Sequence, residues 1–363
     1  MKRIFLLFSL ITLSVSLSAQ SADTSFKSYS KFDFIPGELV IYYEDFSMDA
    51  IGDFPDKWNT NASGEIVNIG NASGKWLKTV NEARYRPEIK TAGFPENFTI
   101  EFDIILKVDN DIDIDGSTQE LKIDLFHASN TQAMDAEADG NGSRFSISSQ
   151  AMRAMNWKNG EGLMDNNQEK RLFTNKDGKS VHVAIWIQKQ RGRLYIDENK
   201  VFDLPQFIPA GMSCNAISFF SGLYWEGRQN LISNIRIAQG TPDMRNKLIT
   251  EGKIVTRGIL FDVNSDKIKP ESNGTLKEIA QTLKDNPTVR VKIIGHTDSD
   301  GTDAANMELS KKRSAAVKNS LAKDFGIDAS RMETDGKGES EPVSPNATSE
   351  GKANNRRVEF IKL

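Results

Sequence analysis

The chain has 363 residues, which is long for one average domain and sufficient for two. Hydrophobic residues make up 38% of the chain and charged residues 26%, a balance typical of globular proteins. The formal net charge of −4, from 46 basic and 50 acidic residues, argues against a nucleic-acid partner, because binding to phosphates needs a basic surface. Cys214 is the one cysteine, so a disulfide within the chain is excluded.

The first twenty residues have the pattern of a signal peptide. Lys2 and Arg3 precede an apolar run from Ile4 to Val15, and small residues follow at Ser18 and Ala19. The apolar run is shorter than the roughly 20 residues that a membrane-spanning helix needs. No cysteine lies near the end of the run to carry a lipid. We therefore expect residues 1–20 to be removed on export, and the mature chain to have no lipid on its N-terminus.

Residues 32–240 are predicted to form an all-β domain. Short segments rich in β-branched and aromatic residues alternate with clusters of Gly and Asn, and no helical periodicity competes with them. Many short strands separated by turns are typical of a sandwich or a barrel. The clearest expected strands are Leu39–Tyr43, Phe98–Leu106, Leu121–Phe126, Val181–Ile187, Arg193–Asp197, Ala216–Phe220 and Leu231–Ile237.

The order of these segments resembles the concanavalin-like jelly roll of laminin-G domains and glucanases. The resemblance rests on Phe54 and Trp58, the long strand that starts at Phe98, the hairpin joined by Lys189–Gly192, and the closing strand Ile232–Arg236. It is a resemblance of pattern, without an invariant motif. It implies a jelly-roll sandwich that binds glycan or protein.

Two features of this region suggest glycan chemistry. Glu101 and Asp103 resemble part of a glucanase carboxylate cluster, but Leu106 stands near the place of the further Glu, so the favoured interpretation is a shared solvent-exposed face. Trp157 and Trp225 lie among Asn and Gly residues and are candidates for stacking on sugars, although aromatic residues in a sandwich are more often packed in its core.

A third feature suggests a cation. Asp111, Asp113 and Asp115 begin the alternating pattern of a calcium loop, but Lys122 stands where the loop needs a bidentate Glu. An acidic, solvated hairpin is therefore favoured over a calcium site. We expect no cofactor, with calcium as the alternative.

Residues 241–252 are predicted to be a linker or short helix, and residues 253–363 a separate α+β domain. Leu276, Ile279, Ala280 and Leu283 recur at helical spacing and form one apolar stripe. The expected order is strand Lys253–Asp262, helix Glu271–Asp285, strand Val289–Gly295, helix Asn306–Phe325, and strands Met332–Gly336 and Val358–Lys362.

Ordered sequence blocks across residues 258–363 carry a more specific resemblance. The blocks are Ile259–Ser265, Lys269 with Pro270, Gly295–Asp298, Asn306 with Leu309, Ser310 and Arg313, Gly336–Pro342, and Asn355–Phe360. Together they resemble the OmpA-like peptidoglycan-binding domain, which implies two helices packed on one face of a mixed sheet. One departure is Ala305, which occupies a place that often holds Tyr.

In that family the ligand is the diaminopimelate of the peptidoglycan stem peptide. The resemblance places the family's acidic residue at Asp298 and its arginine at Arg313. The other residues that it implies for peptidoglycan binding are Thr297, Asn306, Leu309, Arg356 and Asn264.

The chemistry of these residue types suits a zwitterionic ligand. A guanidinium presents a fork of donors that matches a carboxylate, and an aspartate accepts from an ammonium group. We expect the second helix to open at Asp303–Asn306, so that a ligand carboxylate meets both Arg313 and the positive helix N-terminus. A structural salt bridge between Asp298 and Arg313 is the alternative interpretation. His296 is expected to be a hydrogen-bonding residue at a strand end.

The sequence as a whole predicts an exported, non-enzymatic protein of the periplasm, associated with the outer membrane and cell wall. The C-terminal domain would hold peptidoglycan non-covalently, and the jelly roll would contact glycan or protein. Two alternatives stay open: a wall-anchored glycan hydrolase, and an outer-membrane β-barrel with a periplasmic wall-binding domain.

Overall fold

The computed structural model describes residues 32–70, 72–108, 119–130, 133–135, 140–169, 171–173, 178–223, 228–240 and 247–363. The expected signal peptide, the calcium candidates Asp111, Asp113 and Asp115, and Trp225 lie outside these residues. No helix in the described part of the chain is both long and apolar enough to span a membrane.

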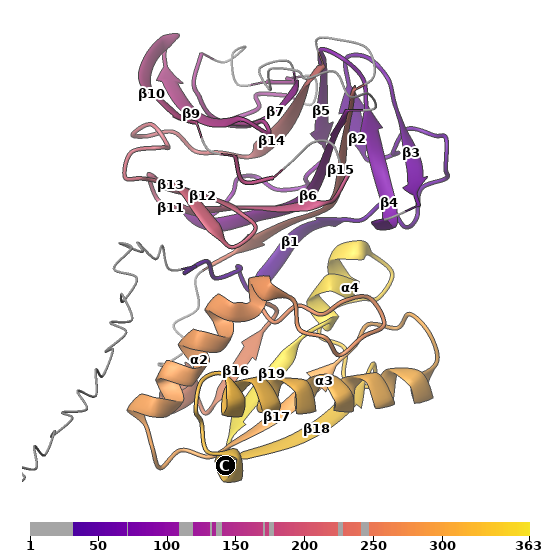
Figure 1. Cartoon of the computed structure of the whole chain (residues 1–363), viewed down its shortest axis with the longest axis vertical. Coiled ribbons are helices and arrows are strands. Elements are labelled where there is room, and N and C mark those ends of the chain that lie inside the picture. The colour runs from indigo at the N-terminus through magenta and orange to yellow at the C-terminus, as the bar shows by residue number, and fades with distance from the viewer. Residues whose placement is uncertain are drawn as a thin grey trace, which may run out of the picture. The chain divides into compact units, whose positions relative to one another are not determined.

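The described residues between 39 and 239 form two antiparallel sheets (Figure 1). In the eight-stranded sheet the order is β13 (Asn199–Leu204), β12 (Arg191–Ile196), β11 (Val181–Gln188), β6 (Asn97–Val108), β15 (Arg228–Gln239), β4 (Ala72–Thr79) and β3 (Gly64–Ile69), and β1 (Leu39–Glu44) also pairs with β15. In the seven-stranded sheet it is β10 (Glu161–Glu169), β9 (Ala151–Lys158), β8 (Gly142–Ile147), β7 (Gln119–Phe126), β14 (Ala216–Leu223), β5 (Ala83–Pro87) and β2 (Trp58–Thr60).

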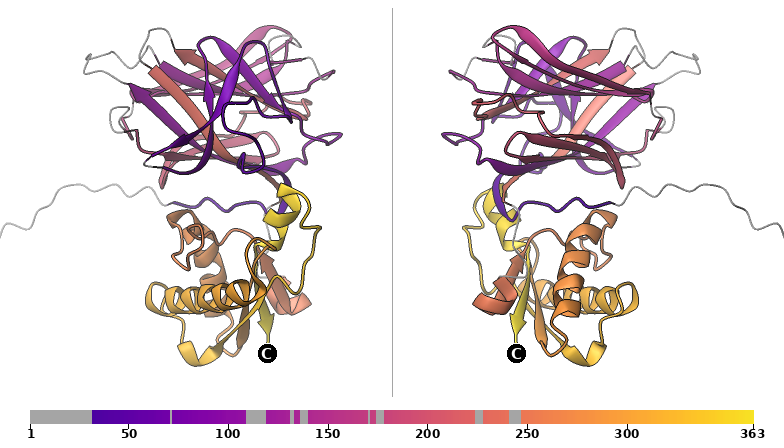
Figure 2. Two further views of the ribbon diagram at one scale, coloured as in Figure 1. Left: turned by 90° about the vertical axis from the view of Figure 1, so that its right-hand side faces the viewer. Right: turned by 90° about the vertical axis from the view of Figure 1, so that its left-hand side faces the viewer.

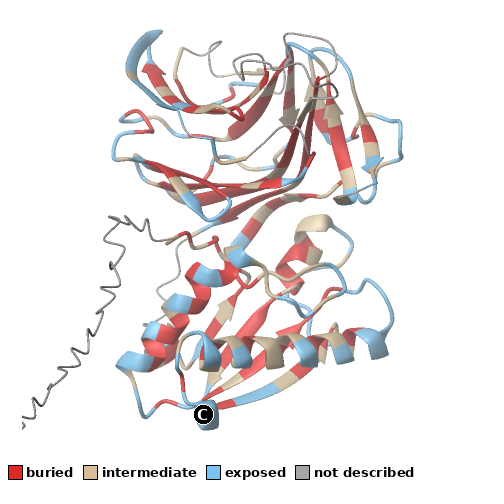
Figure 3. Cartoon of the chain, viewed as in Figure 1, coloured by how far each residue is buried: buried red, intermediate tan, exposed pale blue. Residues whose placement is uncertain are grey.

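A continuous apolar core lies between these sheets. Alternate residues of β6, such as Phe102 and Ile104, are fully buried, as are Leu121 and Ile123 on β7, and all belong to one cluster. Figure 3 shows this burial along the inner strands, whereas β10 is almost entirely exposed. The all-β prediction for this region is confirmed, and the jelly-roll assignment stays a prediction.

The outer face of β6 differs from the expectation of a solvent-exposed carboxylate pair. Glu101 is buried and accepts a hydrogen bond from Nη1 of Arg236 at 2.5 Å, while Asp103 lies 2.8 Å from Nδ1 of His182. Burial by itself would lower the pKa of His182, but its hydrogen bond and charge interaction with Asp103 outweigh burial and raise the pKa to about 9. The carboxylates therefore belong to a paired, buried network.

This network predicts a pH-dependent contribution to stability. Because the folded-state pKa of His182 lies above its ordinary value of 6.5, the stabilisation is complete below pH 6.5 and is lost as pH rises through about 9. We expect the melting temperature to fall between pH 6 and pH 9.5 by about 2–6 °C more in the wild type than in His182→Gln.

The matched control is His127→Gln, which changes an exposed histidine of the same sandwich. Its pH profile should follow that of the wild type. Identical profiles for the wild type and His182→Gln would contradict the assigned role of the Asp103 pair.

The C-terminal residues form a four-stranded mixed sheet with helices on one face. The strand order is β16 (Lys253–Thr256), β19 (Val358–Lys362), β17 (Val291–His296) and β18 (Met332–Gly338), and only the β17–β18 pair is parallel. The helices are α2 (Asn273–Asp285), α3 (Asp303–Lys323) and α4 (Ser349–Asn355), with 3₁₀ turns at Pro270–Ser272 and Ala329–Arg331 and a π-helical turn at Lys247–Glu251.

Both long helices share the core of this sheet, as the sequence predicts. Ile279 and Leu283 of α2 pack with Val317 and Leu321 of α3 in one buried cluster. Figure 2 shows α2 and α3 on the same side of the sheet. The first strand is shorter than expected, because the chain leaves β16 after Thr256 and forms only an isolated bridge farther on.

Two glycines let α3 lie directly on the sheet. A Cβ atom at Gly295 of β17 would come within 2.3 Å of the carbonyl oxygen of Ser310, and one at Gly336 of β18 within 2.4 Å of the Ser310 hydroxyl. Only a residue without a side chain allows this approach. The close contact fixes the position of α3 against the ends of β17 and β18, where the predicted site residues lie.

Candidate functional site

Asp298 lies just beyond the end of β17, in the loop that leads to α3. Its side chain is buried and both carboxylate oxygens have partners. Oδ1 accepts a hydrogen bond from the backbone N–H of Asp300 at 3.1 Å, and Oδ2 accepts one from Nη1 of Arg356 at 2.6 Å. Each carboxylate oxygen has two lone pairs, so each can accept a further donor. The carboxylate is therefore fixed in orientation and still able to bind a cation.

Arg313 is held by backbone carbonyls. Its Nε donates to the carbonyl oxygen of Ser265 at 2.9 Å, Nη2 lies 3.5 Å from that of Asp262, and the guanidinium lies 4.9 Å from the ring centroid of Phe261. Among the described residues, no carboxylate comes within 4 Å of Arg313, and Nη1 has no hydrogen-bond partner. The alternative of a direct salt bridge with Asp298 is therefore not observed.

The negative charges around Arg313 do not balance its positive charge. Burial and the charge of Arg356 together lower its pKa to about 10, because Asp298 and Asp266 oppose them only in part. The guanidinium stays protonated at neutral pH, and a half-buried cation without an anionic partner gains from the arrival of one. The site thus combines an oriented carboxylate with a cation that lacks a counter-ion.

Contrary to the expectation from the sequence, the N-terminus of α3 lies too far from Arg313 to contact the same ligand carboxylate. Arg313 lies about three turns into α3 from its first residue, Asp303, which is roughly 15 Å along the helix axis. The helix dipole acts mainly within the first turn. A carboxylate bound at Arg313 would therefore not reach the positive end of α3, which Thr302 already caps by accepting from the N–H of Ala305.

Asn306 ties the loop of Asp298 to the helix. Its Nδ2 donates to the carbonyl oxygens of Asp298 at 3.3 Å and Asp300 at 3.1 Å, and it also contacts Oε2 of Glu339. Thr297 holds the other side of the loop, since its N–H donates to the carbonyl oxygen of Gly338 at 2.9 Å. These two predicted residues position Asp298 through the backbone.

The remaining predicted residues have different surroundings. Arg356 pairs with Asp298, whereas Asn264 is exposed in the left-handed conformation, with φ of 52°, inside the turn whose carbonyls hold Arg313. Leu309 is half-buried on α3, one turn before Arg313 and on the same side of the helix. Sequence reasoning missed Glu339 as a partner of Asn306, although the block Gly336–Pro342 contained it.

His296 is buried at the end of β17. Its Nε2 lies 3.6 Å from Oε1 of Glu359, and neither ring nitrogen has a hydrogen-bond partner in the described part of the chain. The described residues contain no group of three His, Cys, Asp or Glu side chains arranged to hold a metal ion.

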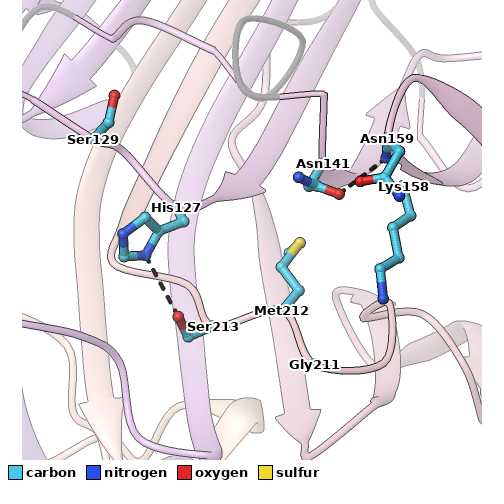
Figure 4. A pocket seen from close by; sticks show the side chains of 8 residues that line it. All are labelled: His127, Ser129, Asn141, Lys158, Asn159, Gly211, Met212 and Ser213. Atoms are coloured by element: carbon cyan, nitrogen blue, oxygen red, sulfur yellow. Dashed lines mark hydrogen bonds between the residues drawn. The ribbon is translucent and has the colours of Figure 1, made fainter.

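A separate cavity of about 440 Å³ opens on the sandwich (Figure 4). Polar side chains form part of its lining: Nδ1 of His127 lies 3.4 Å from Oγ of Ser213, and Oδ1 of Asn141 accepts from the N–H of Asn159 at 3.0 Å. Lys158 supplies a cation to this cavity, but none of its lining residues is a carboxylate. It therefore lacks the pair of opposite charges found at Asp298 and Arg313.

Residues 260–356 match the model of the OmpA family. The C-terminal part of the chain is an OmpA family domain. All of the peptidoglycan-binding residues predicted above, from Asn264 to Arg356, lie inside this match, and the sandwich lies outside it.

Similar proteins match about a third of the chain or less. Outer membrane porin F of Pseudomonas aeruginosa is 44% identical over 101 residues, which are 28% of this chain and 29% of the porin. Probable lipoprotein YiaD of Escherichia coli is 40% identical over 128 residues, 32% of this chain and 58% of the lipoprotein. The solved peptidoglycan-associated lipoprotein from Burkholderia pseudomallei is 27% identical, with a TM-score of 0.29, and the match covers 33% of this chain and 100% of that one.

The Asn306 contacts in the OmpA family domain predict a local loss of order when they are removed. Asn306→Ala removes the donors to two loop carbonyls, which should cost about 1–3 kcal/mol of stability. We expect the amides of residues 298–301 to exchange hydrogen faster, measured by mass spectrometry. Asn319→Ala, at an exposed position of the same helix, is the matched control and should leave this exchange unchanged. Equal exchange in both variants would contradict the role of Asn306.

Proposed function

We propose that the OmpA family domain binds peptidoglycan non-covalently and tethers the exported chain to the cell wall. The observation that carries this proposal is the half-buried Arg313, which has no carboxylate partner among the described residues and lies near the oriented carboxylate of Asp298. The arrangement suits a ligand that brings an anion and a cation together.

The stem peptide of peptidoglycan offers such a ligand in diaminopimelate. The far end of this residue carries an ammonium and a carboxylate on the same carbon atom. The carboxylate would accept from the Nη1 donors of Arg313, while the ammonium would donate to the remaining lone pairs of Asp298. A lysine at this place in the stem peptide has the ammonium but no carboxylate. The site should therefore favour diaminopimelate over lysine.

A role without catalysis is supported by the state of the carboxylates on the sandwich. Glu101 is paired with Arg236 and Asp103 with His182, and Glu101 is only 2% exposed. A hydrolase needs an acid and a nucleophile that reach the scissile bond. This pair therefore does not support the alternative of a wall-anchored glycan hydrolase at Glu101 and Asp103.

The sandwich would make a second contact, to glycan or protein. A groove of about 600 Å³ beside β9 and β10 is lined by residues that include Arg144, Trp157 and Asp165. Trp157 is only 8% exposed and the guanidinium of Arg144 covers its ring at 5.2 Å, so its face is not open for a sugar to stack.

Co-sedimentation with purified peptidoglycan tests the main proposal. Asp298→Asn and Arg313→Gln each remove one charge of the site, and each should weaken binding by about tenfold or more, equivalent to about 1.4 kcal/mol. Peptidoglycan with lysine in place of diaminopimelate should bind the wild type weakly.

Lys312→Gln is the matched control, since it removes one positive charge at an exposed neighbouring position of α3. It should sediment like the wild type. Unchanged sedimentation of both site variants would overturn the assignment. Residual binding of Asp298→Asn to glycan strands stripped of stem peptides would report the contact made by the sandwich.

A further inference from the structure

The edge strand of the sandwich lies against the OmpA family domain. On one side β1 pairs with β15, and on its other side it meets α4 (Figure 1). The side chain of Asn354 continues the ladder: its Oδ1 accepts from the N–H of Val40 at 3.2 Å, and its Nδ2 donates to the carbonyl oxygen of Val40 at 3.1 Å. Val40 also packs with Ala238 and Ala353 in a small buried cluster.

Charged groups strengthen the same contact. Nζ of Lys247 lies 2.7 Å from Oε2 of Glu38, and Nη1 of Arg257 donates to the carbonyl oxygen of Glu38 at 3.1 Å. The backbone and side chains at the start of β1 are thus held by residues on both sides of β16. The otherwise open edge of β1 is therefore covered, which blocks its pairing with another chain.

A β-bulge aims Tyr43 at the binding site. Val40 pairs with Ala238 and Tyr43 with Arg236, so one extra residue, Ile41, stands between the two pairs. The bulge puts Tyr43 on the same face of the strand as Val40, whereas strict alternation would point it toward the opposite face. Tyr43 therefore packs with the cluster at α4 instead of the core between the sheets.

On that face the ring of Tyr43 covers Arg356. The guanidinium lies 4.9 Å from the ring centroid, and its Nη1 donates to Oδ2 of Asp298 at 2.6 Å. Burial lowers the pKa of Arg356, but its interactions with Tyr43 and Asp298 outweigh burial and raise the pKa above its ordinary value. An aromatic ring against one face of a planar guanidinium limits its rotation and leaves its edge directed at a hydrogen-bond acceptor.

We propose that Tyr43 is a positioning residue of the peptidoglycan site, which acts by holding Arg356 against Asp298. The inference rests on the proposed function of Asp298 and deepens it. With the ring in place, Arg356 occupies one lone pair of Oδ2 and the other acceptor sites of Asp298 stay available to the ligand ammonium. Without the ring, Arg356 is free to turn away from Asp298, and the carboxylate loses the hydrogen bond that fixes its orientation. A strand of the sandwich is thereby part of the wall-binding site.

The test uses the full mature chain and titration calorimetry with a diaminopimelate-containing stem peptide. Tyr43→Leu keeps an apolar side chain against Val40 but removes the ring, and it should weaken binding about three- to tenfold. Tyr43→Phe keeps the ring and should bind like the wild type. Equal melting temperatures of the two variants would show that the sandwich is intact.

A double-mutant cycle separates positioning from a general structural effect. If Tyr43 acts through Arg356, the loss caused by Tyr43→Leu should disappear in an Arg356→Gln background. Wild-type affinity of Tyr43→Leu would overturn the inference alone, and so would an equal loss in both backgrounds. Absence of binding by the wild-type chain would overturn both this inference and the proposed function.

Discussion

The site depends on an unequal division of charge between two arginines. Arg356 satisfies one oxygen of Asp298, while Arg313 is held only by backbone carbonyls and the ring of Phe261. If Arg313 paired with Asp298 instead, the two charges would cancel, and neither group would be available to bind a zwitterion. Because Arg356 pairs with Asp298, the carboxylate is held in one orientation. The guanidinium of Arg313 has no anionic partner among the described residues and is available to bind one from a ligand.

The fold maintains this arrangement by placing three segments close together. Gly295 and Gly336 bring α3 against the sheet, so that Arg313 stands beside the loop after β17. Asn306 holds that loop from the first turn of the same helix. The C-terminus of α4 supplies Arg356, whose position depends in turn on Tyr43 of β1. Each contact is modest, and together they set the orientation of Asp298.

The sequence predicts those features that depend on local patterns. The apolar stripe of α2 is a local signal, and both helices lie within three residues of their expected bounds. The exposed strand β10 and the seven-residue helix α4 were missed, because neither has an apolar face that would mark its period. Glu101 and Asp103 were expected in solvent, since strand alternation shows that two residues share a face but not what covers that face.

The candidate site also combines features that the sequence predicts with features that it does not. Asp298, Arg313 and Asn306 could be assigned from the resemblance to the OmpA-like domain. The pairing of Asp298 with Arg356, and the ring of Tyr43 above it, join residues far apart in the chain, and no spacing rule connects them. The expected contribution of the helix N-terminus was wrong because Arg313 lies too far along α3.

The central claim is that Arg313 binds the ligand carboxylate while Asp298 binds its ammonium. It is tested most directly by comparing a diaminopimelate stem peptide with the same peptide amidated at the far carboxylate, on the wild type and on Arg313→Gln. The account predicts that amidation weakens binding to the wild type by about tenfold and leaves the weaker binding to Arg313→Gln unchanged. An equal loss on amidation in both proteins would contradict it.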